Sequence, residues 1–130
     1  MALACPTLAT LKEAYKSVVE KYGLSRMDFD IEGAAIGNSS ANELRAQALA
    51  SLQRDYPNLK LFITLSVNGN GIPSNGQNFL TQLKNNGVIL AGVNIMTMDY
   101  GVRSTQLGQL AIQSANRTQI QLKIDRKSVV

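Results

Sequence analysis

Three acidic residues alternate along a short segment that the sequence predicts to be a β-strand. Asp28, Asp30 and Glu32 are separated by the apolar residues of the segment 27–32, so a strand places their carboxyl groups on one face. Carboxylates this close repel one another, and burying them is costly unless each has a partner or a proton. Because residues two apart stand side by side, we expect Asp30 to share a proton with Glu32. A carboxyl group that stays protonated near neutral pH is what general acid catalysis requires.

Two other interpretations of this acidic strand stay open. At the edge of a sheet the three carboxylates could form a solvated face, although a strand between two helices of an α/β chain is expected to be covered. Carboxylates that alternate at a strand end also bind Mg²⁺ in phosphate-transfer enzymes. This second interpretation predicts a metal-dependent phosphotransferase with a doubly wound fold, but no phosphate-binding glycine-rich loop stands out in the sequence.

Predicted helices and strands alternate along the chain. Apolar periodicity and end signals predict helices over residues 9–22, 42–55, 77–84 and 105–124, and strands over 27–32, 59–67 and 93–97. The small residues 33–40 are predicted to form a loop. This order predicts an α/β fold with a parallel sheet and right-handed crossovers. Active sites of such folds lie at the carboxyl ends of the strands, where Asp30, Glu32 and Asp99 fall.

Composition and charge exclude several classes of partner and site. The 130 residues are enough for one domain, and their 45% hydrophobic content is ordinary for a globular core. The net charge of +4 comes from scattered basic residues, without the run or stripe that a nucleic acid partner would favour. Without histidine, and with Cys5 as the lone cysteine, the chain has no imidazole or thiolate metal site. We expect no cofactor, no nucleic acid partner and no membrane partner.

Two segments resemble signature motifs of the family 18 glycoside hydrolases, the chitinases. Residues 27–32, Met-Asp-Phe-Asp-Ile-Glu, resemble the Asp-x-Asp-x-Glu signature of that family, and residues 93–101 resemble its sixth-strand motif, which usually reads Met-x-Tyr-Asp. One strand and two helices separate them, as between the fourth and sixth strands of the family's barrel. The resemblance covers residues 5–124. It implies a partial (β/α)8 TIM barrel with about three parallel strands alternating with four helices, from a fold of eight such units and about 250 residues.

The resemblance also implies a reaction and a role for each matching residue. The reaction is the hydrolysis of β-1,4-N-acetylglucosamine linkages by a substrate-assisted retaining mechanism, in which the sugar's acetamido oxygen attacks the anomeric carbon. Glu32 would protonate the glycosidic oxygen, Asp30 would share a proton with Glu32 and then hold the N-acetyl nitrogen, and Asp28 would set the charge of Asp30. Asp99 would hydrogen-bond the distorted sugar, and Met96 would line the floor of the site.

The sequence departs from the family pattern at three places. The family's tyrosine that steadies the acetamido oxygen falls at Met98, so Tyr100 becomes the candidate substrate-binding tyrosine. The usual Asp-Gly start of the signature is Ser25-Arg26 here, and the chain has no tryptophan to form the floor of the site. A non-catalytic, lectin-like chitin-binding protein on the same scaffold is the main alternative, although that class usually lacks the motif glutamate.

The resemblance sets the expected domain boundaries. Residues 1–124 would form a partial chitinase-like catalytic barrel, and residues 125–130 would be a non-native tail that resembles a translated sequencing adapter. Three barrel strands leave two open edges and, we expect, a large apolar inner face, so the isolated chain is predicted to fold poorly and to be inactive. The first six residues do not form a complete signal peptide, but we expect the full-length parent to be extracellular and to act on chitin or its oligosaccharides.

Overall fold

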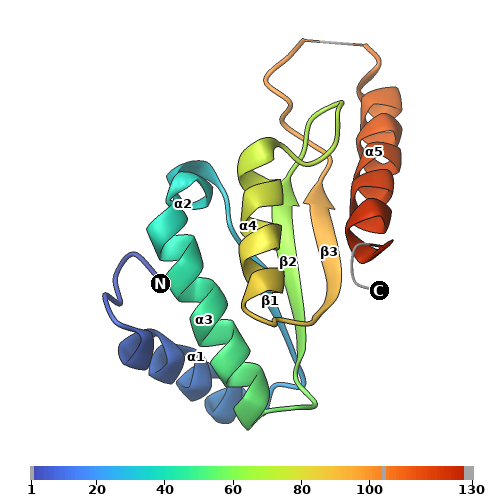
Figure 1. Cartoon of the computed structure of the whole chain (residues 1–130). Coiled ribbons are helices and arrows are strands. Elements are labelled where there is room, and N and C mark those ends of the chain that lie inside the picture. The colour runs from blue at the N-terminus through green and yellow to red at the C-terminus, as the bar shows by residue number, and fades with distance from the viewer. Residues whose placement is uncertain (1, 104, 128–130) are drawn as a thin grey trace.

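Three parallel strands form one sheet with helices packed on one of its faces (Figure 1). The computed structural model describes residues 2–103 and 105–127, with side chains through residue 123. The elements are α1 (Leu8–Tyr22), β1 (Arg26–Asp30), α2 (Gly33–Gly37), α3 (Ser39–Asp55), β2 (Lys60–Ser66), α4 (Ser74–Asn85), β3 (Leu90–Met96) and α5 (Leu107–Lys127). The strand order is β1-β2-β3, so the expected α/β fold with a parallel sheet is confirmed.

Local signals in the sequence set the ends of the first helix. Thr7 forms a capping box with Thr10, which satisfies free backbone N–H groups at the start of α1. Gly23 ends the helix in the left-handed conformation, with a φ of 59°. The chain therefore turns within three residues from α1 into β1, which carries the acidic motif.

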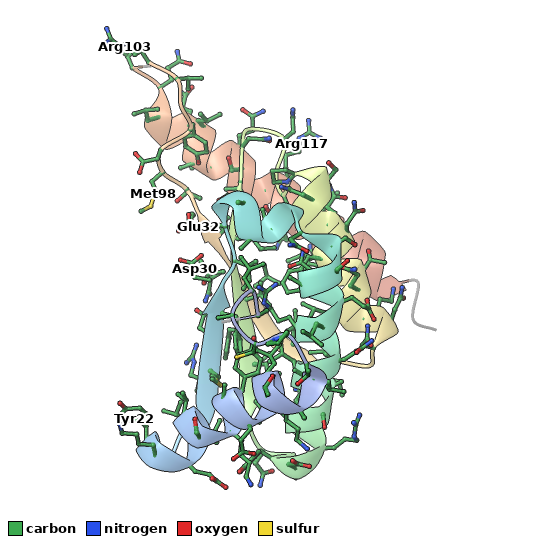
Figure 2. The ribbon with its side chains drawn as sticks, turned by 90° about the vertical axis from the view of Figure 1, so that its left-hand side faces the viewer. Tyr22, Asp30, Glu32, Met98, Arg103 and Arg117 are labelled. Carbon is green, nitrogen blue, oxygen red and sulfur yellow. The ribbon has the colours of Figure 1, made fainter. Side chains whose placement is uncertain are left out.

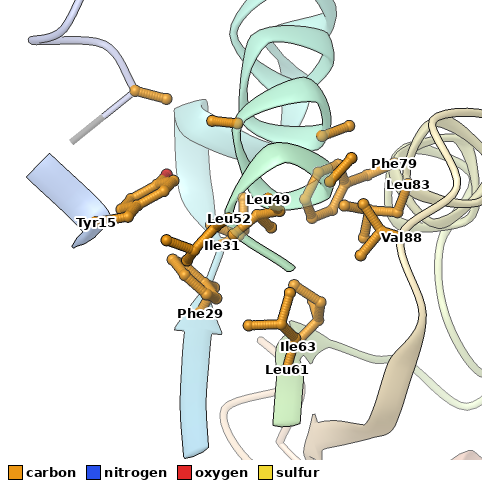
Figure 3. Close-up of a cluster of buried hydrophobic side chains, with 14 of the residues drawn as sticks. Tyr15, Phe29, Ile31, Leu49, Leu52, Leu61, Ile63, Phe79, Leu83 and Val88 are labelled. Carbon is orange, nitrogen blue, oxygen red and sulfur yellow. The ribbon is translucent and has the colours of Figure 1, made fainter. Parts of the chain in front are cut away.

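The core lies between the sheet and helices α1, α3 and α4 (Figure 3). Alternate residues of β1 and β2 point into it, because successive side chains of a strand face opposite ways. Tyr15 of α1 meets Phe29 of β1 edge to face, with ring centroids 5.0 Å apart, a geometry worth about 0.5–1.5 kcal/mol beyond area burial. The buried strand residues are Phe29, Leu61, Ile63 and Leu65, with Ile31 just after β1.

A β-bulge between β2 and β3 determines which residues share the other face. Leu61 pairs with Leu90, whereas the next residue, Phe62, pairs with Gly92. The extra residue in β3 shifts its later residues by one position, so Asn94 pairs with Thr64 on the face opposite the helices. A Cβ at position 92 would lie 2.9 Å from the ring of Phe62, so any larger residue there would force the ring or the backbone to shift.

Two expectations about the elements were wrong. Residues 33–40 are not a simple loop, because they form the short helix α2 and the start of α3, which gives five helices among the described residues instead of four. The buried Asn42 side chain donates to the carbonyl of Ile36 (2.9 Å) and so fixes α2 by a tertiary contact that local sequence does not reveal. Helix α5 also continues to Lys127, past the expected end at residue 124; residues 128–130 lie outside the described part.

The face without helices is polar, so the expectation of a large apolar inner face was also wrong. Its apolar side chains come mainly from Phe62 and Met96. The other described side chains that line it are charged, hydroxyl or amide groups: Arg26, Asp28, Asp30, Lys60, Thr64, Ser66 and Asn94. We call this surface the open face.

We predict that the isolated 130-residue chain self-associates and shows no cooperative melt, because β1 and β3 both have free edges among the described strands. Light scattering across a dilution series would measure the association. Ala91→Lys, on the exposed bulge of β3, should weaken it, whereas Ala115→Lys, on exposed helix α5, should not. A monomer with a cooperative thermal transition would contradict the prediction.

Candidate active site

The three acidic side chains project from the open face at the carboxyl end of β1. Figure 2 shows Asp30 and Glu32 on the same side of the sheet, away from the helices. The intervening Phe29 and Ile31 are buried in the core, so the expected alternation is confirmed. Glu32 lies just past β1, but the backbone N–H of Ile31 still donates to the carbonyl of Thr64 (3.2 Å). This bond keeps the chain extended up to Glu32.

Asp28 is hydrogen-bonded by one residue from each of the other two described strands. The hydroxyl of Thr64 on β2 lies 3.0 Å from both carboxylate oxygens, and the amide of Asn94 on β3 donates to Oδ2 at 2.6 Å. Sequence analysis missed Thr64 and Asn94 as site residues. The available signal was their polarity within two mainly apolar strand segments, 59–67 and 93–97.

The end of β3 brings a second group of predicted residues to the same edge of the sheet. Met96 is the last residue of β3, on the open face, and pairs with Ser66. Asp99 follows it, exposed, with a φ of 48°. Because parallel strands end at one edge, Asp99 lies at the same end of the sheet as Glu32. Figure 2 shows the exposed Met98 at that end too.

Tyr100 is placed differently from the other candidates. Its ring packs against the hydrophobic core, and its hydroxyl is buried without a hydrogen-bond partner among the described residues. In this conformation the hydroxyl of Tyr100 is not accessible to a ligand at the surface.

The open face bears on the alternative interpretations. Asp28, Asp30 and Glu32 are exposed, and β1 is an edge of the described sheet, which is the geometry of a solvated edge strand. The bonds from Thr64 and Asn94 to Asp28 are not expected of a plain solvated face, where water supplies the donors. For the magnesium interpretation, the described residues contain no group of three His, Cys, Asp or Glu side chains that could hold a metal ion.

Comparisons with known sequences point to chitinases, although no family model matches the chain. Over 105 residues, 78% of its length, it is 34% identical to a probable bifunctional chitinase/lysozyme of Escherichia coli (strain K12), of which it covers 12%. It is also 34% identical over 105 residues to endochitinase 11 of Metarhizium anisopliae, of which it covers 20%. The chain thus spans a small part of either relative.

Solved structures agree with these relatives. The fold superimposes on catalytic-site mutants of active domain 2 of a Pyrococcus furiosus chitinase with a TM-score of 0.82 and 29% identity, covering 95% of this chain and 39% of that one. A similar match (TM-score 0.82, 28% identity, 95% and 39% coverage) is to such mutants complexed with chito-oligosaccharides. The catalytic domain of a hyperthermophilic chitinase from the same organism matches with a TM-score of 0.79 at 31% identity, over 90% of this chain and 37% of that one. The chain is therefore chitinase-like, with the fold of part of a TIM-barrel chitinase catalytic domain.

Proposed function

We propose that this chain is part of a family 18 type chitinase and supplies the strand that carries its general acid. The observation that supports this most is the projection of Asp28, Asp30 and Glu32 from one face at the carboxyl end of a parallel strand, with Asp28 bonded across the sheet. The substrate would be a β-1,4-linked polymer or oligomer of N-acetylglucosamine. The names of the relatives support this choice, as does a structural neighbour solved with chito-oligosaccharides.

In the proposed reaction, Glu32 gives its proton to the glycosidic oxygen as the bond from that oxygen to the anomeric carbon breaks. The acetamido oxygen of the same sugar forms the new bond to the anomeric carbon, so the substrate supplies the nucleophile. Water then attacks the anomeric carbon and releases the acetamido group, while the Glu32 carboxylate takes up a proton from the water. The two displacements together retain the configuration at the anomeric carbon.

The other candidate residues assist this reaction. Asp30 stands two residues from Glu32 on the same face and shares its proton before turning to the N-acetyl nitrogen. Met96 lines the floor of the site, and Asp99 contacts the distorted sugar from the end of β3. A substrate-binding role for Tyr100 requires its hydroxyl to leave the buried position that it occupies in this structure.

The proposed activity belongs to a complete barrel. The described chain supplies three parallel strands, and a closed (β/α)8 barrel needs eight, so we propose that the isolated chain is inactive. No described helix is long and apolar enough to cross a membrane. Because chitin is a polymer outside the cell that degrades it, we propose that the parent protein is extracellular.

The acid role can be tested in a completed barrel, in which this chain replaces the matching segment of the Pyrococcus furiosus active domain 2. We predict that Glu32→Gln lowers kcat/KM for chito-oligosaccharides by about a hundredfold, because it removes the proton donor and keeps the shape. Binding of the oligosaccharide should remain. Glu13→Gln, the same change on the exposed surface of α1, should leave both unchanged.

Two outcomes would overturn the proposal in different ways. Equal turnover in Glu32→Gln and in the unsubstituted completed barrel would reject the acid role. Binding of chito-oligosaccharides without release of new reducing ends would instead favour the lectin-like alternative. The exposed Met98, which stands where the family has a tyrosine, is the feature of this chain that favours that alternative.

The backbone of Asp99 generates a further prediction. Its φ of 48° lies in the left-handed region, which asparagine and aspartate tolerate better than other side chains. In the completed barrel, Asp99→Asn should weaken substrate binding through loss of the charge and leave the free energy of unfolding nearly unchanged. Asp99→Ala should weaken substrate binding and should also lower the free energy of unfolding by about 1 kcal/mol. Denaturant titration and binding of chito-oligosaccharides would measure the two effects; equal stability of the two variants would contradict the backbone account.

A further inference from the structure

Three strands each contribute one side chain to a hydrogen-bonded group on the open face. Asp28 of β1 accepts from the Thr64 hydroxyl of β2 at 3.0 Å and from the Asn94 amide of β3 at 2.6 Å. The carboxylates of Asp30 and Glu32 receive no such bond from the described residues. Asp28 is therefore the acidic side chain of the motif that the sheet itself holds in place.

The register shows the direction in which Asp28 is held. Thr64 and Asn94 do not pair with Asp28; Thr64 pairs with Asp30, and Asn94 pairs with Thr64. The two donors therefore lie one row closer to the carboxyl end of the sheet than Asp28 does. To reach them, the carboxylate of Asp28 leans towards the row of Asp30.

The two donors suit a carboxylate at Asp28. A hydroxyl and an amide N–H stabilise a carboxylate, and hydrogen bonds to a charged group are stronger than neutral ones. The single hydroxyl hydrogen of Thr64 is shared between both oxygens, while the amide of Asn94 is committed to Oδ2. The carboxylate is thus contacted at both oxygens.

Other charges around Asp28 do not replace these bonds. The charged groups that share the open face with Asp28 are Arg26 and Asp30 on β1 and Lys60 on β2. The residues of β3 on the same face, Gly92, Asn94 and Met96, carry no charge. The guanidinium of Arg26 lies over the ring of Phe62, 4.1 Å from its centroid. The salt bridges within the described residues join other groups, all on α1 and α3.

We propose that Thr64 and Asn94 are positioning residues, which hold the carboxylate of Asp28 directed at Asp30 so that its charge supports the proton shared by the Asp30–Glu32 pair. This inference rests on the proposed function. A negative charge beside Asp30 favours a protonated neighbour, because two adjacent carboxylates resist ionising together. The proton that Glu32 delivers is thereby retained at the carboxyl end of the strand.

The test is the pH dependence of kcat/KM in the completed barrel. Loss of the donors removes the hydrogen bonds that hold the Asp28 carboxylate, so the acid limb of the profile should move upward. We expect a shift of about one pH unit in the double variant Thr64→Val, Asn94→Ala. The single variant Thr64→Ser keeps the hydroxyl, so its acid limb should stay where it lies in the unsubstituted barrel. Thr81→Val and Asn78→Ala, on the exposed surface of α4, are matched controls and should shift nothing.

The outcomes separate this inference from the proposed function. An unmoved acid limb in a folded double variant would overturn the positioning role, even where Glu32→Gln abolishes turnover. Turnover that survives Glu32→Gln would overturn the proposed function itself. If the double variant does not fold, carbon-13 NMR titration of the Asp28 carboxyl in Thr64→Val and Thr64→Ser decides the point. A higher midpoint in the valine variant supports the inference, and equal midpoints overturn it.

Discussion

The one-residue bulge between β2 and β3 determines the composition of the open face. A regular pairing would turn Asn94 and Met96 towards the helices, because a shift of one residue moves a strand's side chains to the opposite face. With the bulge, Asn94 pairs with Thr64 and its amide reaches Asp28. The close approach of Phe62 to Gly92 belongs to the same irregularity, since a side chain at that position would collide with the ring. The polar group of the candidate site therefore depends on a backbone irregularity near the start of β3.

Burial of one face of the acidic strand determines the direction of the acidic side chains on its other face. Phe29 and Ile31 are buried among aromatic and aliphatic side chains, and this packing fixes the strand against rotation about its own axis. Because side chains alternate along a strand, Asp30 and Glu32 therefore face away from the helices. The carboxylates repel one another, but burial of their apolar neighbours opposes that repulsion. Within the described part of the chain, Asp28 is the one of the three that accepts hydrogen bonds from β2 and β3.

Local patterns in the sequence predicted the parts of the fold that local patterns determine. The alternation along residues 27–32 predicted the correct face for each acidic side chain, and the first helix was predicted over residues 9–22, within one residue of its observed bounds. The third strand was predicted to be clearest at residues 93–97, whereas β3 begins at Leu90, because the bulge interrupts the alternation that marks a strand. Bonds to Asp28 from residues 36 and 66 positions further along the chain could not be predicted without the register. The open face was expected to be apolar because barrel interiors are usually filled with bulky branched side chains.

The attachment of α2 to α3 has a mechanical consequence for Glu32. The carbonyl of Glu32 accepts from the N–H of Ala35 in α2, and the last turn of α2 is held by Asn42, which is buried in α3 and bonded to Arg45. The backbone at Glu32 is thus anchored through α2 to the buried Asn42 of α3. Such an anchor would hold the backbone of Glu32, the proposed acid, at a fixed height above the sheet.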